Sequence, residues 1–183
     1  IPGDIASLDE FSLSTLAIAL AVLLVASGFF SIAETAMMAA NRYRLKHRAA
    51  RGDRGAKLAL ALLGETDRLL GVILFGNNLL NAGTATLAGV ITGRLLGEGE
   101  LALAASTVVV TFLILVFSEI TPKVIGAAHA DRIAPLVAFV LSPLLRGLTP
   151  VVWFVNLFVQ GLLVLLRVKS APEGSTQLTQ EEL

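Results

Sequence analysis

Long apolar runs separated by short polar breaks dominate this chain. The three longest runs are residues 11–40, 67–96 and 101–126. A helix needs about 20 apolar residues to cross the hydrocarbon core of a bilayer, so each run predicts one transmembrane helix. Asp9 precedes the first run. Its side chain is expected to cap that helix by accepting from the free backbone N–H groups of the first turn.

The remaining apolar segments are shorter or broken. Residues 56–66 are too short to span and predict an amphipathic or re-entrant helix. Residues 97–100 read GEGE and predict a tight turn between the second and third spans. Residues 133–168 are apolar but interrupted by prolines, which break or kink helices. Here we expect a helix along the membrane surface at 131–146, then a helix at 151–167 that does not complete a crossing.

Composition confirms the membrane setting and the charge pattern orients the chain. Only 15% of the 183 residues are charged and 55% are hydrophobic, whereas a soluble domain carries about 25% charged residues. Seven of the 14 Lys and Arg residues lie in residues 42–57, against one acid, Asp53. The positive-inside rule therefore predicts that this segment is cytoplasmic and the N-terminus external. Arg167 and Lys169 favour a cytoplasmic C-terminus.

The same composition argues against nucleic-acid binding and against catalysis. The formal net charge is zero, so we expect no nucleic-acid partner and interpret the basic segment as a solvated face toward lipid. There is no cysteine, and the two histidines are too far apart in sequence for a helical metal pair. No Ser-His-Asp arrangement or glycine-rich phosphate loop is visible, and His129 beside Asp131 is weak evidence for hydrolysis. We expect a protein that is not an enzyme.

Side chains with oxygen atoms gather at membrane depth. Three asparagines fall within five residues of the second run, where an unpaired carboxamide is costly because no water reaches it. Hydroxyls, amides and carboxylates are the ligands that a hard cation such as Mg²⁺ prefers, in an octahedral set of six. Zinc or copper would favour nitrogen and sulfur ligands, which are missing. The candidates are Ser27, Ser31, Glu34, Asn77, Asn78, Asn81, Thr84, Thr86, Ser118, Glu119 and Thr121.

Each of these groups also has a structural interpretation. A serine or threonine in a membrane helix most often bonds the carbonyl four residues earlier, and an asparagine often joins two helices. Glu34 could pair with a basic residue near the inner surface. Glu119 is harder to explain in this way, because intramembrane carboxylates usually mark a functional site. Lys123 is the cation near it in sequence and could either pair with Glu119 or reach toward the interface.

Two backbone features add to the picture. Pro122 has no N–H and deprives the carbonyl of Ser118 of its helical donor, so a kink with free carbonyl oxygens is expected. Gly89, Gly93 and Gly97 recur every four residues, a pattern that lets helices approach closely. This stripe fits packing within one subunit and a dimer seam equally well.

Three motifs, in order and at consistent spacing, carry a family resemblance. They are SGFFSIAETAMMAANRYRL, GNNLLNAGTATL and FSEITPKVIGAAHADRIA. Over about residues 10–168 the chain resembles the transmembrane domain of the CorC/CNNM family of magnesium transporters. The resemblance implies an all-α membrane protein with three transmembrane helices, a short re-entrant or helical hairpin and a juxtamembrane belt helix. It also implies a homodimer in the inner (plasma) membrane, followed by cytosolic CBS domains that bind ATP, and export of Mg²⁺ in exchange for Na⁺.

The resemblance further implies ligands where the motifs match. These are Ser27, Ser31, Asn81 and Glu119, although the residues alone do not rank Asn81 above its two neighbours. The groups expected to support or gate the site are Glu34, Asn77, Asn78, Ser118, Pro122 and Lys123.

Two functions follow as hypotheses. In the first, the domain is an ion carrier. In the second, it is a membrane anchor and Mg²⁺ sensor for a cytosolic regulatory domain, without transport. In both, residues 1–10 form an extracytoplasmic segment, 11–168 the transmembrane domain and 169–183 a cytosolic linker toward a missing CBS domain. We therefore interpret the chain, which starts without Met, as a trimmed piece and not as one that begins with a signal peptide.

Overall fold

The computed structural model of the protein describes residues 11–97, 99–151, 154 and 157, and these residues form helices without any strand. The chain divides into two units after Arg146, and the helices and contacts discussed here belong to the first. They are α1 (Leu13–Ala39), α2 (Arg42–Ala50), α3 (Arg54–Gly64), α4 (Thr66–Leu96), α5 (Glu100–Leu113), the π-helix η2 (Ile114–Ile120), α6 (Thr121–Ala128) and α7 (Ala130–Gly147).

Three helices of the described part are long and apolar enough to cross a membrane. They are α1, α4 and the rod formed by α5, η2 and α6, which qualifies from Leu103 to Ala128. The predicted all-helical class with three spans is therefore confirmed. The expected cap at Asp9 is wrong, because α1 begins at Leu13 and the hydroxyl of Ser12 accepts from the backbone N–H of Thr15 at 3.3 Å.

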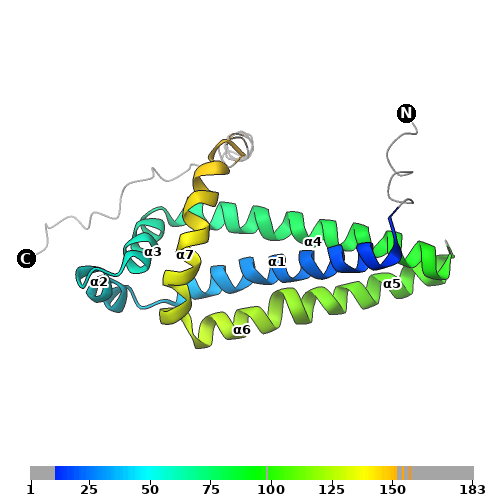
Figure 1. Cartoon of the computed structure of the whole chain (residues 1–183), viewed down its shortest axis with the longest axis horizontal. Coiled ribbons are helices and arrows are strands. Elements are labelled where there is room, and N and C mark those ends of the chain that lie inside the picture. The colour runs from blue at the N-terminus through cyan, green and yellow to red at the C-terminus, as the bar shows by residue number, and fades with distance from the viewer. Residues whose placement is uncertain (1–10, 98, 152–153, 155–156, 158–183) are drawn as a thin grey trace, which may run out of the picture. The chain divides into compact units, whose positions relative to one another are not determined.

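Helix α1 lies between the other two spans, as Figure 1 shows, and packs against α4 on one side and against η2 and α6 on the other. Glycines allow the close approach. A Cβ at Gly28 would lie 3.1 Å from the carbonyl oxygen of Phe117, and one at Gly126 would lie 2.8 Å from that of Ile32. Because backbone cannot move aside as a flexible side chain can, this interface requires a residue without a side chain at Gly126.

The third span forms a wide helical turn immediately before Pro122. Residues 114–120 form a π-helix, in which the N–H of Thr121 bonds the carbonyl of Val116, five residues earlier. Pro122 then lies in the first turn of α6, where a missing N–H needs no replacement. Wide π-helical turns occur frequently at functional sites in α-helices, and this one carries Ser118 and Glu119.

A helical hairpin follows α1. Asn41 caps α2 and Asp53 caps α3, each by accepting backbone N–H groups with its side chain. The short helix predicted over residues 56–66 is present as α3, which begins earlier, at Arg54, and buries Ala59 and Leu62. We call the end of the long helices that carries this hairpin the hairpin end.

Helix α7 confirms the helix expected at 131–146 and crosses the long helices at the hairpin end (Figure 1). It packs closely on α3, since a Cβ at Gly55 would lie 2.6 Å from the carbonyl oxygen of Pro135. One face of α7 is buried, while Leu136 and Phe139 are exposed on another. An apolar exposed face is typical of a helix that lies in a membrane interface; its position on the inner surface stays a prediction.

Two predicted segments near the C-terminus lie mostly or entirely outside the described residues. The helix expected at 151–167 lies outside the described residues except for Val151, Phe154 and Leu157, which are helical. The linker at 169–183 lies outside them entirely.

The glycine stripe of α4 has no close neighbour in the described part of the chain. An added Cβ at Gly89 or Gly93 meets no described atom within 4 Å, so packing within this part does not explain these glycines.

Candidate functional site

Three oxygen atoms converge at the middle of the bundle, where α1 faces α4. Ser27 lies next to the midpoint of α1 and is fully buried, and Asn81 lies at the midpoint of α4. The hydroxyl of Ser27 donates to the Oδ1 atoms of Asn77 and Asn81, at 2.6 and 2.7 Å. One hydroxyl hydrogen is shared by two carbonyl oxygens, so in this group of three side chains, the Ser–Asn cluster, the two amide oxygens compete for one donor.

The structure separates the three asparagines. Asn77 and Asn81 are four residues apart and share the face of α4 toward α1. Asn78 lies about 100° further around the helix and is exposed. Sequence reasoning grouped Asn77 with Asn78, although the i, i+4 spacing of Asn77 and Asn81 was a signal that could have paired them instead.

Ser31 is buried one turn from Ser27 along α1, toward the hairpin end. Its side chain has no exposed area, and its hydroxyl has no hydrogen-bond partner among the described residues. Leaving a buried polar group unpaired costs about 1–3 kcal/mol, so such groups need an explanation, and a missing ion or water is one of the usual ones. Ser31 therefore stays a candidate ligand.

Ser118 is equally buried but satisfied. Its hydroxyl donates to the backbone carbonyl of Leu24 at 3.0 Å and thereby joins η2 to α1. Thr84 and Thr86 bond the carbonyls four residues earlier, at 2.8 and 3.0 Å, so the structural interpretation holds for both. These hydroxyls are already occupied by backbone partners.

Two carboxylates meet one ammonium group nearer the hairpin end. The Nζ atom of Lys123 lies 3.3 Å from Oε1 of Glu119 and 3.8 Å from Oε2 of Glu34. Glu34 therefore pairs with a basic residue, as its structural interpretation held, but the partner comes from the third span and not from residues 42–57. We call these three residues the Glu–Lys cluster, and its formal charge is −1.

Helix α1 connects the two clusters. Ser27, Ser31 and Glu34 follow each other on one face, with rises of about 6 and 4.5 Å along the axis. The unpaired hydroxyl of Ser31 thus lies between the two levels. The described contacts place Glu119 with Lys123 and Glu34; they do not join it to Ser27 or Asn81. No three His, Cys, Asp or Glu side chains of the described residues gather around a common point.

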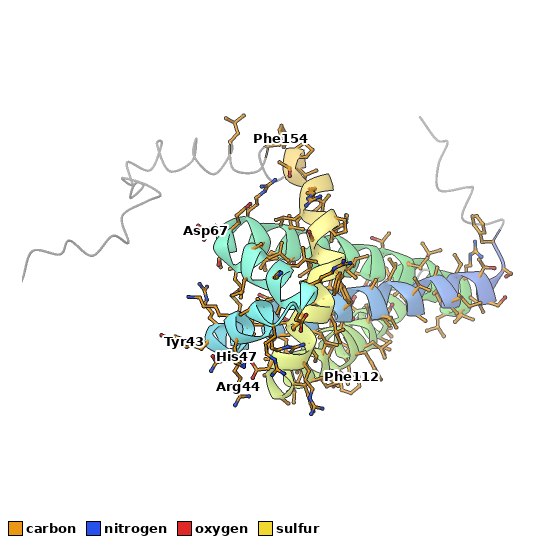
Figure 2. The ribbon with its side chains drawn as sticks, turned by 60° about the vertical axis from the view of Figure 1, so that its left-hand side comes forward. Tyr43, Arg44, His47, Asp67, Phe112 and Phe154 are labelled. Carbon is orange, nitrogen blue, oxygen red and sulfur yellow. The ribbon has the colours of Figure 1, made fainter. Side chains whose placement is uncertain are left out.

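A second polar network lies at the hairpin end. The carboxylate of Asp131 accepts from the backbone N–H of Asn41 and from Arg44, both at 2.9 Å. Arg48 donates to the backbone carbonyl of Asp131 at 2.7 Å and to the carboxylate of Asp53 at 2.9 Å. These bonds tie the start of α7 to the hairpin, and we call the network the Asp131 clasp. Figure 2 shows Tyr43, Arg44 and His47 together at this end.

The clasp lowers the pKa of both of its carboxyl groups. For Asp131 the main cause is the hydrogen bond from the backbone N–H of Asn41, followed by Arg44. For Asp53 it is the backbone N–H of Ala56, followed by the side chain of Arg48. A surface pocket of about 470 Å³ adjoins Asp131 and His129. Because the Asp131 carboxylate is already paired twice, the pocket offers no free base beside His129.

Comparison with known proteins adds an independent line of information. The profile of the CNNM family, described as the cyclin M transmembrane N-terminal domain, matches residues 18–183. A UPF0053 protein of Haemophilus influenzae is 41% identical over 162 residues, which cover 88% of this chain and 38% of the relative. The UPF0053 inner membrane protein YfjD of Escherichia coli is 40% identical over 157 residues, covering 86% and 36%.

A plant relative shows how widely this domain occurs. The chloroplastic DUF21 domain-containing protein At1g55930 of Arabidopsis thaliana is 32% identical over 165 residues, covering 90% of this chain and 24% of the relative. The chain therefore spans less than two fifths of the length of the three relatives. The similarity applies to one domain of longer proteins.

Proposed function

Because the chain belongs to the CNNM family of transmembrane domains, we propose that it is the transport domain of a protein that carries Mg²⁺ across a membrane. The transport is export in exchange for Na⁺, as the CorC/CNNM resemblance implies. The domain acts as an ion carrier and not as an enzyme. The membrane is the inner (plasma) membrane, a setting supported by the printed name of the Escherichia coli relative.

The Ser–Asn cluster is the observation that carries this proposal. The amide oxygens of Asn77 and Asn81 lie 2.6 and 2.7 Å from the hydroxyl oxygen of Ser27 and share its one hydrogen. In a bilayer core no water supplies a further donor to these two amide oxygens, and a cation bound to them and to the Ser27 hydroxyl oxygen would stabilise them. Mg²⁺ and Na⁺ are hard cations that both accept neutral oxygen ligands, and Mg²⁺ takes six of them.

Neighbouring groups complete the proposed site. Ser31 contributes the hydroxyl that has no protein partner, and Glu119 contributes negative charge. Asn77 joins Asn81 as a ligand candidate, since both make the same contact to Ser27. Ser118 and Pro122 support the site by fixing η2 and α6 against α1, while Asn78 is exposed on another face and has no part in binding.

The predicted topology indicates from which side of the membrane Mg²⁺ enters the domain. The basic hairpin places the hairpin end in the cytoplasm, by the positive-inside rule, with the N-terminus outside and the C-terminus inside. Mg²⁺ reaches the centre of the bundle from the hairpin end, passing the carboxylates of the Glu–Lys cluster. A rearrangement of the helices then opens the site outward, and Na⁺ uses the same oxygens on return.

The whole protein contains more than this domain. The relatives are more than twice as long as the matched region, which leaves room for the ATP-binding CBS domains that the resemblance implies. In the proposed organisation residues 1–10 are external, 11–168 form the transmembrane domain and 169–183 lead to those domains. The protein functions as a homodimer, with the glycines of α4 that face open space at its seam.

The test measures Mg²⁺ efflux from Mg²⁺-loaded cells that express the full-length protein. A Mg²⁺-sensitive dye reports the efflux, and Na⁺ is supplied in the external medium. Asn81→Ala is expected to abolish efflux while the protein still reaches the membrane. Asn78→Ala is the matched control, because it changes the same residue type on the same helix outside the site, and it should transport normally. Normal efflux by both Asn81→Ala and Ser27→Ala would exclude the site.

Purified protein in liposomes separates the carrier from the anchor and sensor. The carrier predicts Mg²⁺ flux that requires a Na⁺ gradient. Saturable Mg²⁺ binding without flux, in protein that includes its cytosolic domains, would instead support a sensor.

A further inference from the structure

We propose that Lys123 is a tethered counter-cation: its ammonium group offsets one of the two negative charges of Glu119 and Glu34 while the site is empty and is displaced when Mg²⁺ binds. This inference rests on the proposed function and adds a residue that sets the affinity and release of the ion. It concerns a side chain that is not itself a ligand.

The geometry shows one ammonium shared by two helices. Nζ of Lys123 lies 3.3 Å from the carboxylate of Glu119 on η2 and 3.8 Å from that of Glu34 on α1. Both separations are longer than the 2.7–2.9 Å of a tight charge-assisted hydrogen bond. The ammonium therefore donates one long hydrogen bond, to Glu119, and is attracted to Glu34 by charge.

The side chain of Lys123 is free to leave. Its exposed fraction is 39%, close to the 38% of Glu119, and a lysine side chain rotates about four carbon–carbon bonds. Lys123 follows Pro122 in the first turn of α6, so its backbone is fixed while its head group moves. A displaced ammonium can turn toward the hairpin end, where the positive-inside rule already places cationic groups.

The charges explain why such a group is useful. Without Lys123 the two carboxylates would carry −2 at membrane depth, which is costly in the empty state. With Lys123 the cluster carries −1 when the site is empty. An arriving Mg²⁺ compensates the same carboxylates and releases the ammonium, so binding must compete with an internal cation. The competition weakens binding and correspondingly favours release, which a carrier needs in each cycle.

A purely structural role makes the opposite prediction. If Lys123 only joins α1 to the third span, its replacement should loosen the helices and weaken Mg²⁺ binding. If it is a counter-cation, replacement by an uncharged residue should tighten binding. The direction of the change in Mg²⁺ affinity therefore discriminates between the two roles.

The experiment titrates Mg²⁺ into the purified full-length protein in lipid nanodiscs by calorimetry. Lys123→Gln is expected to lower the Kd about tenfold, equivalent to 1.4 kcal/mol, and to slow Mg²⁺ release from preloaded protein. Lys123→Arg keeps the charge and should bind close to the unaltered protein. Lys57→Gln is the control, because Lys57 is exposed on α3 and has no ion pair among the described residues.

A second measurement needs no variant. Acylation of Lys123 by an amine-reactive ester, followed by mass spectrometry of the unaltered protein, should increase several-fold when Mg²⁺ is added, since the ammonium leaves its carboxylates. Unchanged or weaker Mg²⁺ binding by Lys123→Gln, or labelling of Lys123 that ignores Mg²⁺, would overturn the counter-cation. Absence of any Mg²⁺ binding by the unaltered protein would remove the proposed function and this inference together.

Discussion

The Ser–Asn cluster and the Asp131 clasp are both polar networks that join distant parts of the chain, but they differ in how their hydrogens are distributed. In the clasp each described carboxylate oxygen faces an N–H group of an arginine or of the backbone. In the cluster two amide oxygens share the hydrogen of one hydroxyl, and the hydroxyl of Ser31 nearby has no hydrogen-bond partner in the described part of the chain.

This difference distinguishes a network that stabilises the fold, the clasp, from one that we propose binds an ion, the Ser–Asn cluster. The clasp lies at the hairpin end beside exposed arginines, where water supplies any missing hydrogen bond, and yet it is complete. The cluster lies at the centre of two predicted spans, where an incomplete network is most costly. A binding site for a passing cation requires polar groups that lack a hydrogen-bond partner in the protein, because the ion then supplies the missing partner.

Replacing Ser31 should give the largest separation between binding and stability. Ser31→Ala removes a ligand candidate and also removes a buried hydroxyl that has no partner. Mg²⁺ affinity should fall by about 10–100-fold, as for other changes around metal sites, whereas stability should stay the same or rise. Calorimetry measures the affinity and a thermal melt in detergent measures the stability. A melting temperature that falls together with the affinity would show that Ser31 has a structural partner.

Breaking the clasp should have the opposite profile. Asp131→Ala leaves Arg44 and the N–H of Asn41 without their acceptor. The melting temperature should fall by about 2–4 °C, corresponding to about 1 kcal/mol, because the lost bonds are partly exposed and screened. Mg²⁺ affinity in the same preparation should not change. A loss of affinity as large as that of Ser31→Ala would mean that the clasp also shapes the cation site.

The sequence predicts these two networks to very different extents. The three spans follow from apolar length alone, because a bilayer demands it, and the oxygen-rich residues stand out against that background. Asn77 was underestimated, although its i, i+4 spacing to Asn81 places both on one face. The residue that caps α1 is Ser12 and not the predicted Asp9, because the hydroxyl of Ser12 immediately precedes the first helical residue.

Other features depend on contacts that no local pattern contains. Asp131 meets Asn41 and Arg44 across about 90 residues of chain, and nothing near Asp131 in the sequence indicates this pairing. The π-helix η2 forms where the backbone of Phe117 comes so near Gly28 that an added Cβ there would lie 3.1 Å from the Phe117 carbonyl oxygen. Packing between helices determines both the pairing of Asp131 and the π-helix, and the local sequence predicts neither.

Ser118 offers a smaller test within the bundle. Ser118→Ala removes the hydrogen bond to the carbonyl of Leu24 and should reduce the free energy of unfolding by about 1 kcal/mol. It should leave Mg²⁺ affinity within a few-fold of the unaltered protein, since this hydroxyl is already occupied. The pair Ser31→Ala and Ser118→Ala, measured side by side, compares two fully buried serines that differ only in having a partner. Equal losses of affinity in the two variants would contradict the distinction.

The smallest expected effect is the response of the clasp to acid. The pKa of Asp131 is lowered from its ordinary value of 3.8 by the N–H of Asn41 and by Arg44, and that of Asp53 is lowered similarly. A carboxyl group with a lowered pKa in the folded state stabilises the protein above its ordinary pKa, and this contribution is lost as the pH falls through the lowered value. The melting temperature should therefore decline modestly below about pH 4. In Asp131→Asn, which cannot ionise, the decline should be smaller. An equally steep decline in Asp131→Asn would show that the effect of acid comes from groups other than Asp131, with Asp53 as the first to examine.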